Sequence, residues 1–333
     1  MKALIQRLVE ATGPSGYESQ VRDLIRKEIG ADAEHVQVDA LGNLIATKGQ
    51  LATGGQRIML AAHMDEIGLI ATHVDEHGYV RFTTLGGVSR QTCVGGRVRF
   101  LNGTPGVIAE EYSEDAGKLP TFEQLFIDVG ATSREGCPVR VGDVAAFDRS
   151  FAVVGERWVA KAMDDRIGVA VLIEVLRRLS HGPNQVAFVF SVQEEVGLRG
   201  ATTAAFGLDP DIGIAVDVTR SGDTPHGLRM AVGLGKGPAI KVRDSGMLSD
   251  PRLVEALRRT AEMHRIPYQL EVLEMGTTDA RAIQLSRAGV PSGCVSIPCR
   301  YLHSPSEMVD SNDIQNAVAL LVQLLSQPIE LGN

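Results

Sequence analysis

Apolar residues near the start of the chain recur at helical spacing. Leu4 and Leu8 are four residues apart, and Val21 and Ile25 resume the same period further along. The two runs are separated by Gly13-Pro14-Ser15-Gly16, a combination of residues that is typical of a turn. The pattern therefore predicts two amphipathic helices with a break between them.

A buried strand is predicted next, from the apolar run that begins at Arg57 and ends at Ala62. From about Leu69 to Ala152 the pattern changes to short runs in which apolar and polar residues alternate, separated by Gly, Asn, Asp and Pro. Examples are Gly78–Phe82, Gly96–Phe100 and Gly106–Ala109. Alternation with a period of two is typical of half-buried strands, so this region predicts a small all-β barrel or sandwich.

After Trp158, apolar runs of strand length alternate with segments of helical period. Strands are predicted at 186–192, 212–216, 268–273 and 293–297, and helices at 167–179, 251–264, 279–288 and 312–325. This alternation predicts a sheet covered by helices on both faces. The fold class is therefore α/β, with a helix-covered central mixed sheet and an inserted small all-β domain. The predicted boundaries are 1–68 for the first α/β segment, 69–155 for the insert and 156–333 for the second α/β segment.

The composition is that of a globular protein with a sizeable core. Of the 333 residues, 44% are hydrophobic and 22% are charged, and the formal net charge is −8. This acidic balance argues against nucleic acid as a partner. Gln6, Arg7 and Glu10 interrupt the first apolar segment, so no secretory signal is expected, and no run has the ~18 apolar residues of a membrane span. Four scattered cysteines without a C-x-x-C pair predict reduced thiols, and we expect a cytoplasmic protein.

Acidic and histidine side chains follow several of the predicted strands. Glu194 and Glu195 come directly after the apolar run 186–192, and two adjacent buried carboxylates are costly unless positive charge compensates them. Because ligands of open α/β sheets bind beyond the carboxyl ends of strands, we expect such residues to converge at one edge. The candidates are His63 and Asp65 after the first strand, Asp164 at the start of a helix, Glu194, Glu195, Asp217 after the strand 212–216, and His303 on the loop after the strand that ends at Ile297.

These residue types predict a metal centre. Carboxylates and imidazoles without thiolates suit Zn²⁺, Co²⁺ or Mn²⁺ in an open catalytic site better than a closed structural zinc. One Asp that bridges two ions, with one His and one carboxylate completing each site, leaves room for a bridging water. A spare Glu beside a liganding Glu can take the proton of that water. Asp65 is placed to accept the other N–H of the His63 imidazole and so to orient it.

Five motifs occur in the order and spacing of a known family. They are Ala61–Gly68, Lys161–Arg166, Gln193–Gly197, Ala215–Asp217 and Arg300–Ser304. Through these motifs, which cover essentially the whole chain, the sequence resembles the di-metal aminopeptidases that include glutamyl, deblocking and tetrahedral (TET) aminopeptidases. The resemblance implies a central sheet of the zinc-peptidase type and a cis peptide bond between Asp164 and Asp165. It also implies that the inserted β domain mediates dimer contacts within a dodecamer.

The same resemblance implies a metal-dependent aminopeptidase that removes N-terminal residues from short peptides. Two divalent ions would share Asp164 as a ligand. His63 and Asp217 would complete the site of one ion, and Glu195 and His303 would complete the site of the other. Glu194 would be the general base and Asp65 the partner of His63. The ions would be Zn²⁺ or Co²⁺, with Mn²⁺ as a third candidate.

Several alternatives stay open. An acylase or carboxypeptidase-like hydrolase could use the same metal set and recognise the other end of its substrate. A glycoside hydrolase needs only two carboxylates, which leaves two histidines unexplained, although some relatives of the family carry an endoglucanase label. A catalytically silent assembly protein is hard to reconcile with an intact Glu194. Asp164 could be an ordinary helix N-cap. Asp279 could either cap the helix that follows it or lie in the substrate pocket, and we favour the cap.

Overall fold

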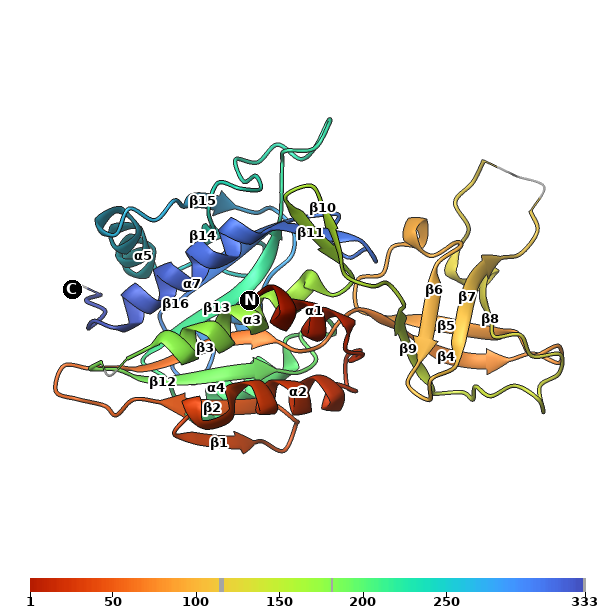
Figure 1. Ribbon diagram of the computed structural model, residues 1–333, viewed down its shortest axis with the longest axis horizontal. Helices are drawn as coiled ribbons and strands as arrows, with labels where there is room; N and C mark the ends of the chain where they lie inside the picture. Colours follow the sequence, from red (N-terminus) through yellow and green to blue (C-terminus); the bar gives the residue numbers. More distant parts are fainter. Residues whose placement is uncertain (114–116, 181, 332–333) are drawn as a thin grey trace.

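The computed structural model describes residues 1–113, 117–180 and 182–331. Their helices and strands form an α/β body and a smaller β body that lies to one side of it (Figure 1). Residues 114–116 of the predicted insert and residues 181, 332 and 333 of the predicted second α/β segment lie outside the described residues.

The α/β body is organised around a mixed sheet to which the described residues contribute eleven strands. Nine of them follow the order β1 (His35–Val38), β2 (Leu44–Lys48), β12 (Gln185–Ser191), β3 (Arg57–His63), β13 (Ile212–Arg220), β16 (Ser292–Arg300), β17 (Glu307–Asp310), β11 (Arg157–Ala160) and β10 (Ala152–Val154). β14 (Ala239–Arg243) pairs with β16, and β15 (Gln269–Val272) pairs with β14. The four central strands β12, β3, β13 and β16 are parallel, whereas the outer ones are mostly antiparallel. The predicted mixed sheet is confirmed.

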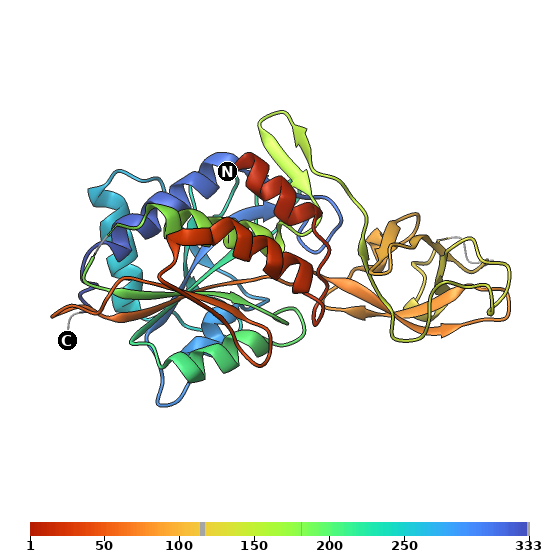
Figure 2. The ribbon, with the colours of Figure 1, turned by 60° about the horizontal axis from the view of Figure 1, so that its bottom comes forward.

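Helices cover both faces of this sheet (Figure 2). One face carries α1 (Lys2–Glu10), α2 (Ser19–Ile29), α3 (Met163–Arg178), α5 (Pro251–Met263) and α7 (Ser311–Leu325), and the other carries α4 (Arg199–Leu208) and α6 (Asp279–Gln284). Successive side chains of a strand point to opposite faces. In β3, Ile58 and Leu60 therefore pack into the core under α3 and α7, whereas Met59 and Ala61 pack with α4 and α6. Burial on both faces explains why the central strands are continuously apolar.

The inserted β body is a closed barrel. Its described strands follow the order β4 (Gly68–Val74), β5 (Val80–Leu85), β8 (Leu125–Asp128), β7 (Pro105–Glu110), β6 (Arg97–Phe100) and β9 (Val144–Phe147). The sequence pattern allowed a barrel or a sandwich, and the pairing of β9 with both β4 and β6 closes the barrel. Leu69, Val80, Phe100 and Ile108 belong to a core that is separate from the core of the α/β body. The chain passes directly from β3 into β4 and leaves from β9 towards β10 (Figure 1).

Several predicted boundaries differ from those of the structure. The strand predicted at 212–216 continues to Arg220, so Asp217 lies within β13 rather than after it, and β16 continues past Ile297 to Arg300. The helix predicted over 279–288 ends at Gln284. Its C-cap Leu285, with φ −91° and ψ 7°, is no longer helical, and Arg287, with φ +49°, lies in the left-handed region. The sequence pattern does not predict β1, β2, β14, β17 or α4, whose apolar runs are short. Among the described residues, 3₁₀-helices also occur at Gly30–Asp32, Arg90–Thr92 and Phe122–Gln124.

The four cysteines are free thiols, and Cys93, Cys294 and Cys299 are buried. Burial raises the pKa of Cys93 to about 11, so this thiol is protonated and unreactive at neutral pH.

In the described ranges, every helix is too short or too polar to cross a membrane.

Candidate metal centre

Three neighbouring strands bring four of the predicted site residues to one edge of the sheet. His63 is the last residue of β3, Asp217 lies level with it on β13, and Glu194 and Glu195 follow the end of β12. Because adjacent strands lie only ~4.8 Å apart, residues that are far apart in the sequence become close neighbours here. The expected convergence at the carboxyl ends of the parallel strands is observed.

Asp164 lies at the start of α3, where the backbone is not yet helical. Ala162 has φ +53°, and Asp164 and Asp165 have non-helical dihedral angles. The peptide bond between these two aspartates is cis, as the family resemblance implied. The Asp164 carboxylate faces two imidazoles, with Oδ1 3.0 Å from Nε2 of His63 and Oδ2 3.2 Å from Nε2 of His303. A single carboxylate therefore connects two histidines from distant parts of the chain.

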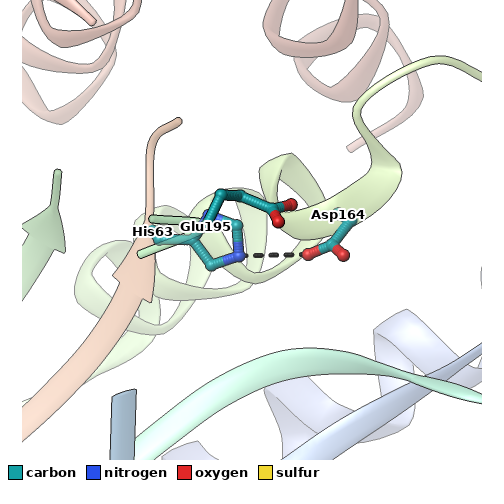
Figure 3. A group of neighbouring side chains, drawn as sticks. All are labelled: His63, Asp164 and Glu195. Atoms are coloured by element: carbon teal, nitrogen blue, oxygen red, sulfur yellow. Dashed lines mark hydrogen bonds and ion pairs between the residues drawn. The ribbon is translucent and has the colours of Figure 1, made fainter. Parts of the chain in front are cut away.

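The remaining acids surround this centre. Oε2 of Glu195 is 3.6 Å from Nε2 of His303, and Oε2 of Glu194 is 3.9 Å from Nε2 of His63. Figure 3 shows Glu195 beside His63 and Asp164, with the contact between the imidazole and the Asp164 carboxylate. Among the described residues, two groups of side chains have potential metal-ligand atoms within 4.8 Å of one another. One group is His63, Asp164 and Glu195, and the other is His63, Glu194 and Asp217. The structure thus brings the five predicted ligands and Glu194 into one site.

The carboxylates of this site are poorly solvated. Burial raises the pKa of Glu195 to about 7, and the charge of Asp164 adds to the shift. Burial also raises the pKa of Glu194 and of Asp217 well above the usual range. Oε1 of Glu195 is buried and has no hydrogen-bond partner within the described part of the chain. A divalent cation would compensate these charges and satisfy this oxygen, so the residues present fit a metal site.

The two histidines respond to the same surplus of negative charge. Burial tends to lower the pKa of His63, but the charge of Glu194 and hydrogen bonds with Asp164 and Asp65 raise it well above its usual range. For His303, burial is likewise outweighed by Asp164 and Glu195, which raise the pKa to about 10. Because an imidazole must be neutral to bind a metal, a cation would displace these protons, and we expect metal binding to release protons.

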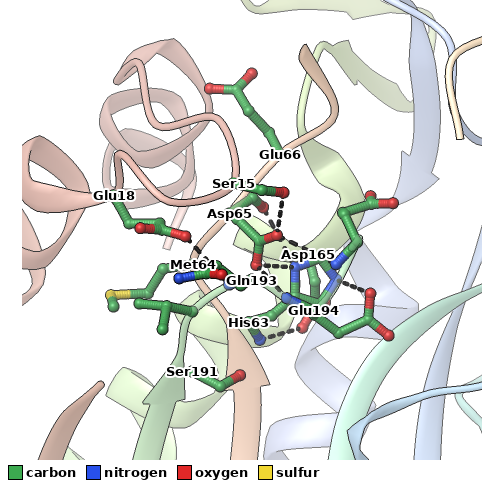
Figure 4. Close-up of polar contacts among 12 residues, drawn as sticks. Ser15, Glu18, His63, Met64, Asp65, Glu66, Asp165, Ser191, Gln193 and Glu194 are labelled. Carbon is green, nitrogen blue, oxygen red and sulfur yellow. Dashed lines mark hydrogen bonds and ion pairs between the residues drawn. The ribbon is translucent and has the colours of Figure 1, made fainter. Parts of the chain in front are cut away.

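Asp65 holds the turn after β12 against the end of β3 (Figure 4). Its buried carboxylate accepts hydrogen bonds from the backbone N–H groups of Glu194 at 2.9 Å and Glu195 at 3.2 Å, and from the Ser15 hydroxyl at 2.6 Å. Its Oδ1 is also 3.4 Å from Nδ1 of His63, and that nitrogen is 3.2 Å from the Asp65 carbonyl oxygen. The sequence predicted only the contact with His63, whereas Asp65 also orients the backbone of both glutamates.

A buried ionic cluster supports the segment around Asp164. Nζ of Lys161 is 2.7 Å from Oε2 of Glu66, and Nη2 of Arg166 is 3.3 Å from Oε1 of Glu66. The Arg166 guanidinium also donates hydrogen bonds to the carbonyl oxygens of Met64 and Leu8. These contacts connect the residues on both sides of Asp164 to the loop after His63.

Four side chains that contact the site are not among the candidates that the sequence pattern predicts. Asp165 accepts a hydrogen bond from the backbone N–H of His63 at 3.3 Å, and Glu18 accepts one from the backbone N–H of Gln193 at 3.1 Å. The other two are Ser15, described above, and Glu307. Only Asp165 had a sequence signal, its position next to Asp164. Ser15 and Glu18 lie far in sequence from the groups that they contact, and Glu307, although close to His303 in sequence, lies far from Asp164.

The prediction that Asp279 caps a helix is wrong. Thr278 is the N-cap of α6, and its hydroxyl accepts a hydrogen bond from the backbone N–H of Ala280 at 3.4 Å. Asp279 is the first helical residue, so its side chain points back to the sheet, where it accepts a hydrogen bond from the Ser191 hydroxyl at 2.5 Å. Burial raises the pKa of Asp279 to about 6.

The site opens into a cavity of about 930 Å³, a size that is typical of sites for small ligands. The four acids Asp164, Glu194, Glu195 and Asp217 lie in its wall together with both histidines. The rest of the lining is mixed, with apolar side chains such as Leu198, Phe206 and Met275 and polar or cationic ones such as Thr202 and Arg281. The arrangement places a cluster of potential metal ligands at the bottom of a cavity that could hold a peptide side chain.

Comparison with known proteins gives one family. A model of the M42 glutamyl aminopeptidase family matches residues 42–320. The chain is 46% identical over 325 residues to a putative aminopeptidase of Acetivibrio thermocellus, and the match covers 97% of each chain. It is 36% identical over 340 residues to the lysyl aminopeptidase of Pyrococcus furiosus, covering 97% of this chain and 96% of that one.

Solved structures agree with this result. The aminopeptidase APDkam598 from the archaeon Desulfurococcus kamchatkensis has a TM-score of 0.91 and 41% identity, covering 97% of this chain and 94% of that one. The TET1 peptidase of Pyrococcus horikoshii, described as able to assemble into a tetrahedron or a large octahedral shell, has a TM-score of 0.87 and 34% identity, covering 98% and 99%. The PhTET1-12s structure, described as a dodecamer, has a TM-score of 0.89 and 33% identity with the same coverage.

Proposed function

Because the chain belongs to the M42 glutamyl aminopeptidase family and is therefore an aminopeptidase, we propose that it removes N-terminal residues from short peptides with two divalent metal ions and Glu194 as general base. The observation that carries this proposal is the Asp164 carboxylate, whose two oxygens face His63 and His303 separately. A carboxylate in this position is suited to two neighbouring cations.

In this proposal Asp164 is shared by both ions, His63 and Asp217 complete one site, and Glu195 and His303 complete the other. The distance of 3.6 Å between Glu195 Oε2 and His303 Nε2 supports the second pairing. The proposed ions are Zn²⁺ or Co²⁺, with Mn²⁺ as a third candidate, because the donor set is oxygen and nitrogen only. When bound, such a pair lowers the pKa of a water molecule and polarises the scissile carbonyl.

Glu194 would move the proton in this reaction. It would take a proton from the attacking water on a carboxylate oxygen and deliver it to the leaving amine. Its raised pKa suits a group that must both accept and release a proton, and neighbouring cations would keep it ionised before the attack. Asp65 would keep Glu194 in place through the hydrogen bond from the Glu194 backbone N–H at 2.9 Å. It would also orient the His63 imidazole from the side of Nδ1.

We also propose how the chain is organised outside the site. Its division would be 1–68 and 156–333 for the catalytic α/β domain and 69–155 for an oligomerisation domain, which is supported by the separate core of the barrel. A dodecamer built from dimers is proposed because two structures related to this chain are described as a dodecamer and as a tetrahedral or octahedral shell. A cytoplasmic location is proposed from the four free cysteines.

The test is hydrolysis of a panel of aminoacyl-p-nitroanilides by metal-stripped protein, with and without added Zn²⁺ or Co²⁺. Activity that metal restores and that N-acetylation of the substrate abolishes would support the proposal. Cleavage of only the acetylated substrates would support the acylase-like alternative instead. The family match disfavours that alternative, and also the glycoside hydrolase.

A further inference from the structure

Glu307 joins two segments that carry predicted metal ligands. Its Oε2 accepts a hydrogen bond from the backbone N–H of Asp164 at 3.0 Å, and its Oε1 accepts one from the backbone N–H of His303 at 2.8 Å. The residue is only 2% exposed. Each carboxylate oxygen therefore holds the backbone of a different ligand, although 138 residues lie between Asp164 and His303 in the sequence.

The sheet topology explains how one residue reaches both segments. Glu307 is the first residue of β17, which lies between β11 and β16 in the sheet. β11 leads into the turn that carries Asp164, and β16 leads into the loop that carries His303. Glu307, at the start of β17, thus lies between the loop that follows β11 and the loop that follows β16.

These two loops need such support because their backbones adopt sparsely populated conformations. Ala162, Tyr301 and His303 have φ values of +53°, +60° and +61°, in the left-handed region. Residues other than glycine persist there only when the surrounding structure holds them. The Glu307 carboxylate accepts hydrogen bonds from both loops and so holds the backbone at Asp164 and His303, whose side chains approach to 3.2 Å.

We propose that Glu307 is a positioning residue that fixes Asp164 and His303 for the metal ion they share, and this inference rests on the proposed di-metal function. The ion next to Glu195 and His303 has two of its ligands tethered by Glu307, whereas the ion next to His63 and Asp217 has only Asp164 tethered. Loss of the tether should therefore weaken mainly the first of these ions. Partners that orient metal ligands typically contribute about 10- to 100-fold in metal affinity.

The test is titration of metal-free Glu307→Gln with Co²⁺, in which calorimetry gives the two binding constants and the absorption spectrum reports the coordination geometry. Glutamine has nearly the same shape, but its amide offers one acceptor oxygen and turns an NH₂ group towards the second backbone N–H. We expect one binding step to weaken by about 10- to 100-fold, the other to change less, and the Co²⁺ spectrum to shift.

The chain contains a matched control in Asp313. Its carboxylate is fully buried and accepts backbone hydrogen bonds from Gly235 and Gly237, both at 2.7 Å. Asp313→Asn also replaces a carboxylate that accepts two backbone hydrogen bonds, and it also removes one charge. This position lies away from the predicted ligands. We expect this variant to lose stability and to keep both Co²⁺ binding constants.

Glu307→Asp separates positioning from charge, because it keeps the charge and shortens the reach by one methylene. It also serves if Glu307→Gln does not fold. We expect Glu307→Asp to lose affinity at the same binding step. Wild-type affinity in Glu307→Asp, or an equal loss in Asp313→Asn, would overturn the proposal. If the wild-type protein binds fewer than two ions, the proposed di-metal function fails instead, and the two failures are distinguishable.

Discussion

Glu194 and Glu195 are neighbours in the sequence, yet the ion-pair contacts of their carboxylates are with different histidines. Glu194 approaches His63 at 3.9 Å and Glu195 approaches His303 at 3.6 Å. Asp65 makes this division possible, because it accepts hydrogen bonds from both of their backbone N–H groups. At the scale of single residues, the site therefore depends on which way two adjacent side chains point, and we expect the two glutamates to respond differently to substitution.

Substitution of Glu194 by Gln should abolish turnover and leave both metal ions bound. The amide cannot accept the proton of the attacking water, and the loss of a general base typically lowers kcat by about 10²- to 10⁴-fold. The measurement is kcat on an aminoacyl-p-nitroanilide together with the metal content of the purified variant. Full activity in Glu194→Gln would refute the general-base assignment, and loss of an ion would assign Glu194 as a ligand.

Substitution of Asp164 by Ala should remove at least one of the two ions. Its carboxylate is the group that faces both His63 and His303, so both proposed metal sites lose a donor. The metal-to-protein ratio after dialysis, measured by elemental analysis, is expected to fall from two to one or less. Two tightly bound ions in Asp164→Ala would contradict the role of Asp164 as the shared ligand.

At the scale of elements, the inserted barrel contributes to the site through the loop after β5. A Cβ atom added at Gly86 would lie 3.0 Å from Oε2 of Glu195, and one added at Gly87 would lie 2.5 Å from Nδ1 of His303. The loop thus packs against two predicted ligands of the same ion, and a side chain at position 87 fits only if the His303 ring moves. The barrel therefore contacts the site from behind two of its predicted ligands.

We expect Gly87→Ala to displace the His303 ring and to weaken the ion next to it. Displacement of a metal ligand should lower kcat/KM by at least about 10-fold, because small misplacements at a reacting centre are costly. The matched control is Gly136→Ala, also between strands of the barrel, where an added Cβ would meet nothing closer than Ser133 Oγ at 3.4 Å. Equal kcat/KM and metal affinity in the two variants would show that the barrel loop does not control the site.

At the scale of the whole molecule, the predicted ligands come from segments that span most of the chain. The entire barrel lies in sequence between His63 and Asp164. Of the other ligands, Glu195 follows β12, Asp217 lies within β13 and His303 follows β16. Ions bound at this centre would therefore connect segments that are remote in sequence. Because an unfolded chain cannot present these ligands together, binding should favour the folded state.

Removal of the metal ions should lower the melting temperature. A ligand present at 100 times its Kd stabilises the folded state by about 2.7 kcal/mol, which for a chain of this length corresponds to roughly 4 °C per ion. The measurement is differential scanning calorimetry of the protein with a chelator, after chelator removal, and after addition of Zn²⁺ or Co²⁺. An unchanged melting temperature in all three states would contradict the proposed metal centre.

Much of the fold could be predicted because its signals are local. The continuous apolar run before Glu194 and the alternation around Gly96–Phe100 each reflect burial within one segment, and both appear as strands in the structure. The ends of strands and helices were less predictable where a single segment contains both apolar core residues and polar residues of the site. Asp217 lies within β13 although it is charged, because the strand continues along β16 beyond the site. The N-cap of α6 fell one residue earlier than predicted, on Thr278.

By itself, the sequence determined the residue types of the site, their order along the chain and the class of elements that carry them. These depend on hydrophobic period and on the motifs around His63, Asp164, Glu195 and His303. Only the tertiary structure decided which side chains support them. The roles of Ser15 and Glu307, and the close packing of position 87 against His303, arise from contacts between segments that the fold brings together. A single sequence carries no signal of such contacts, because each partner alone has no unusual neighbourhood.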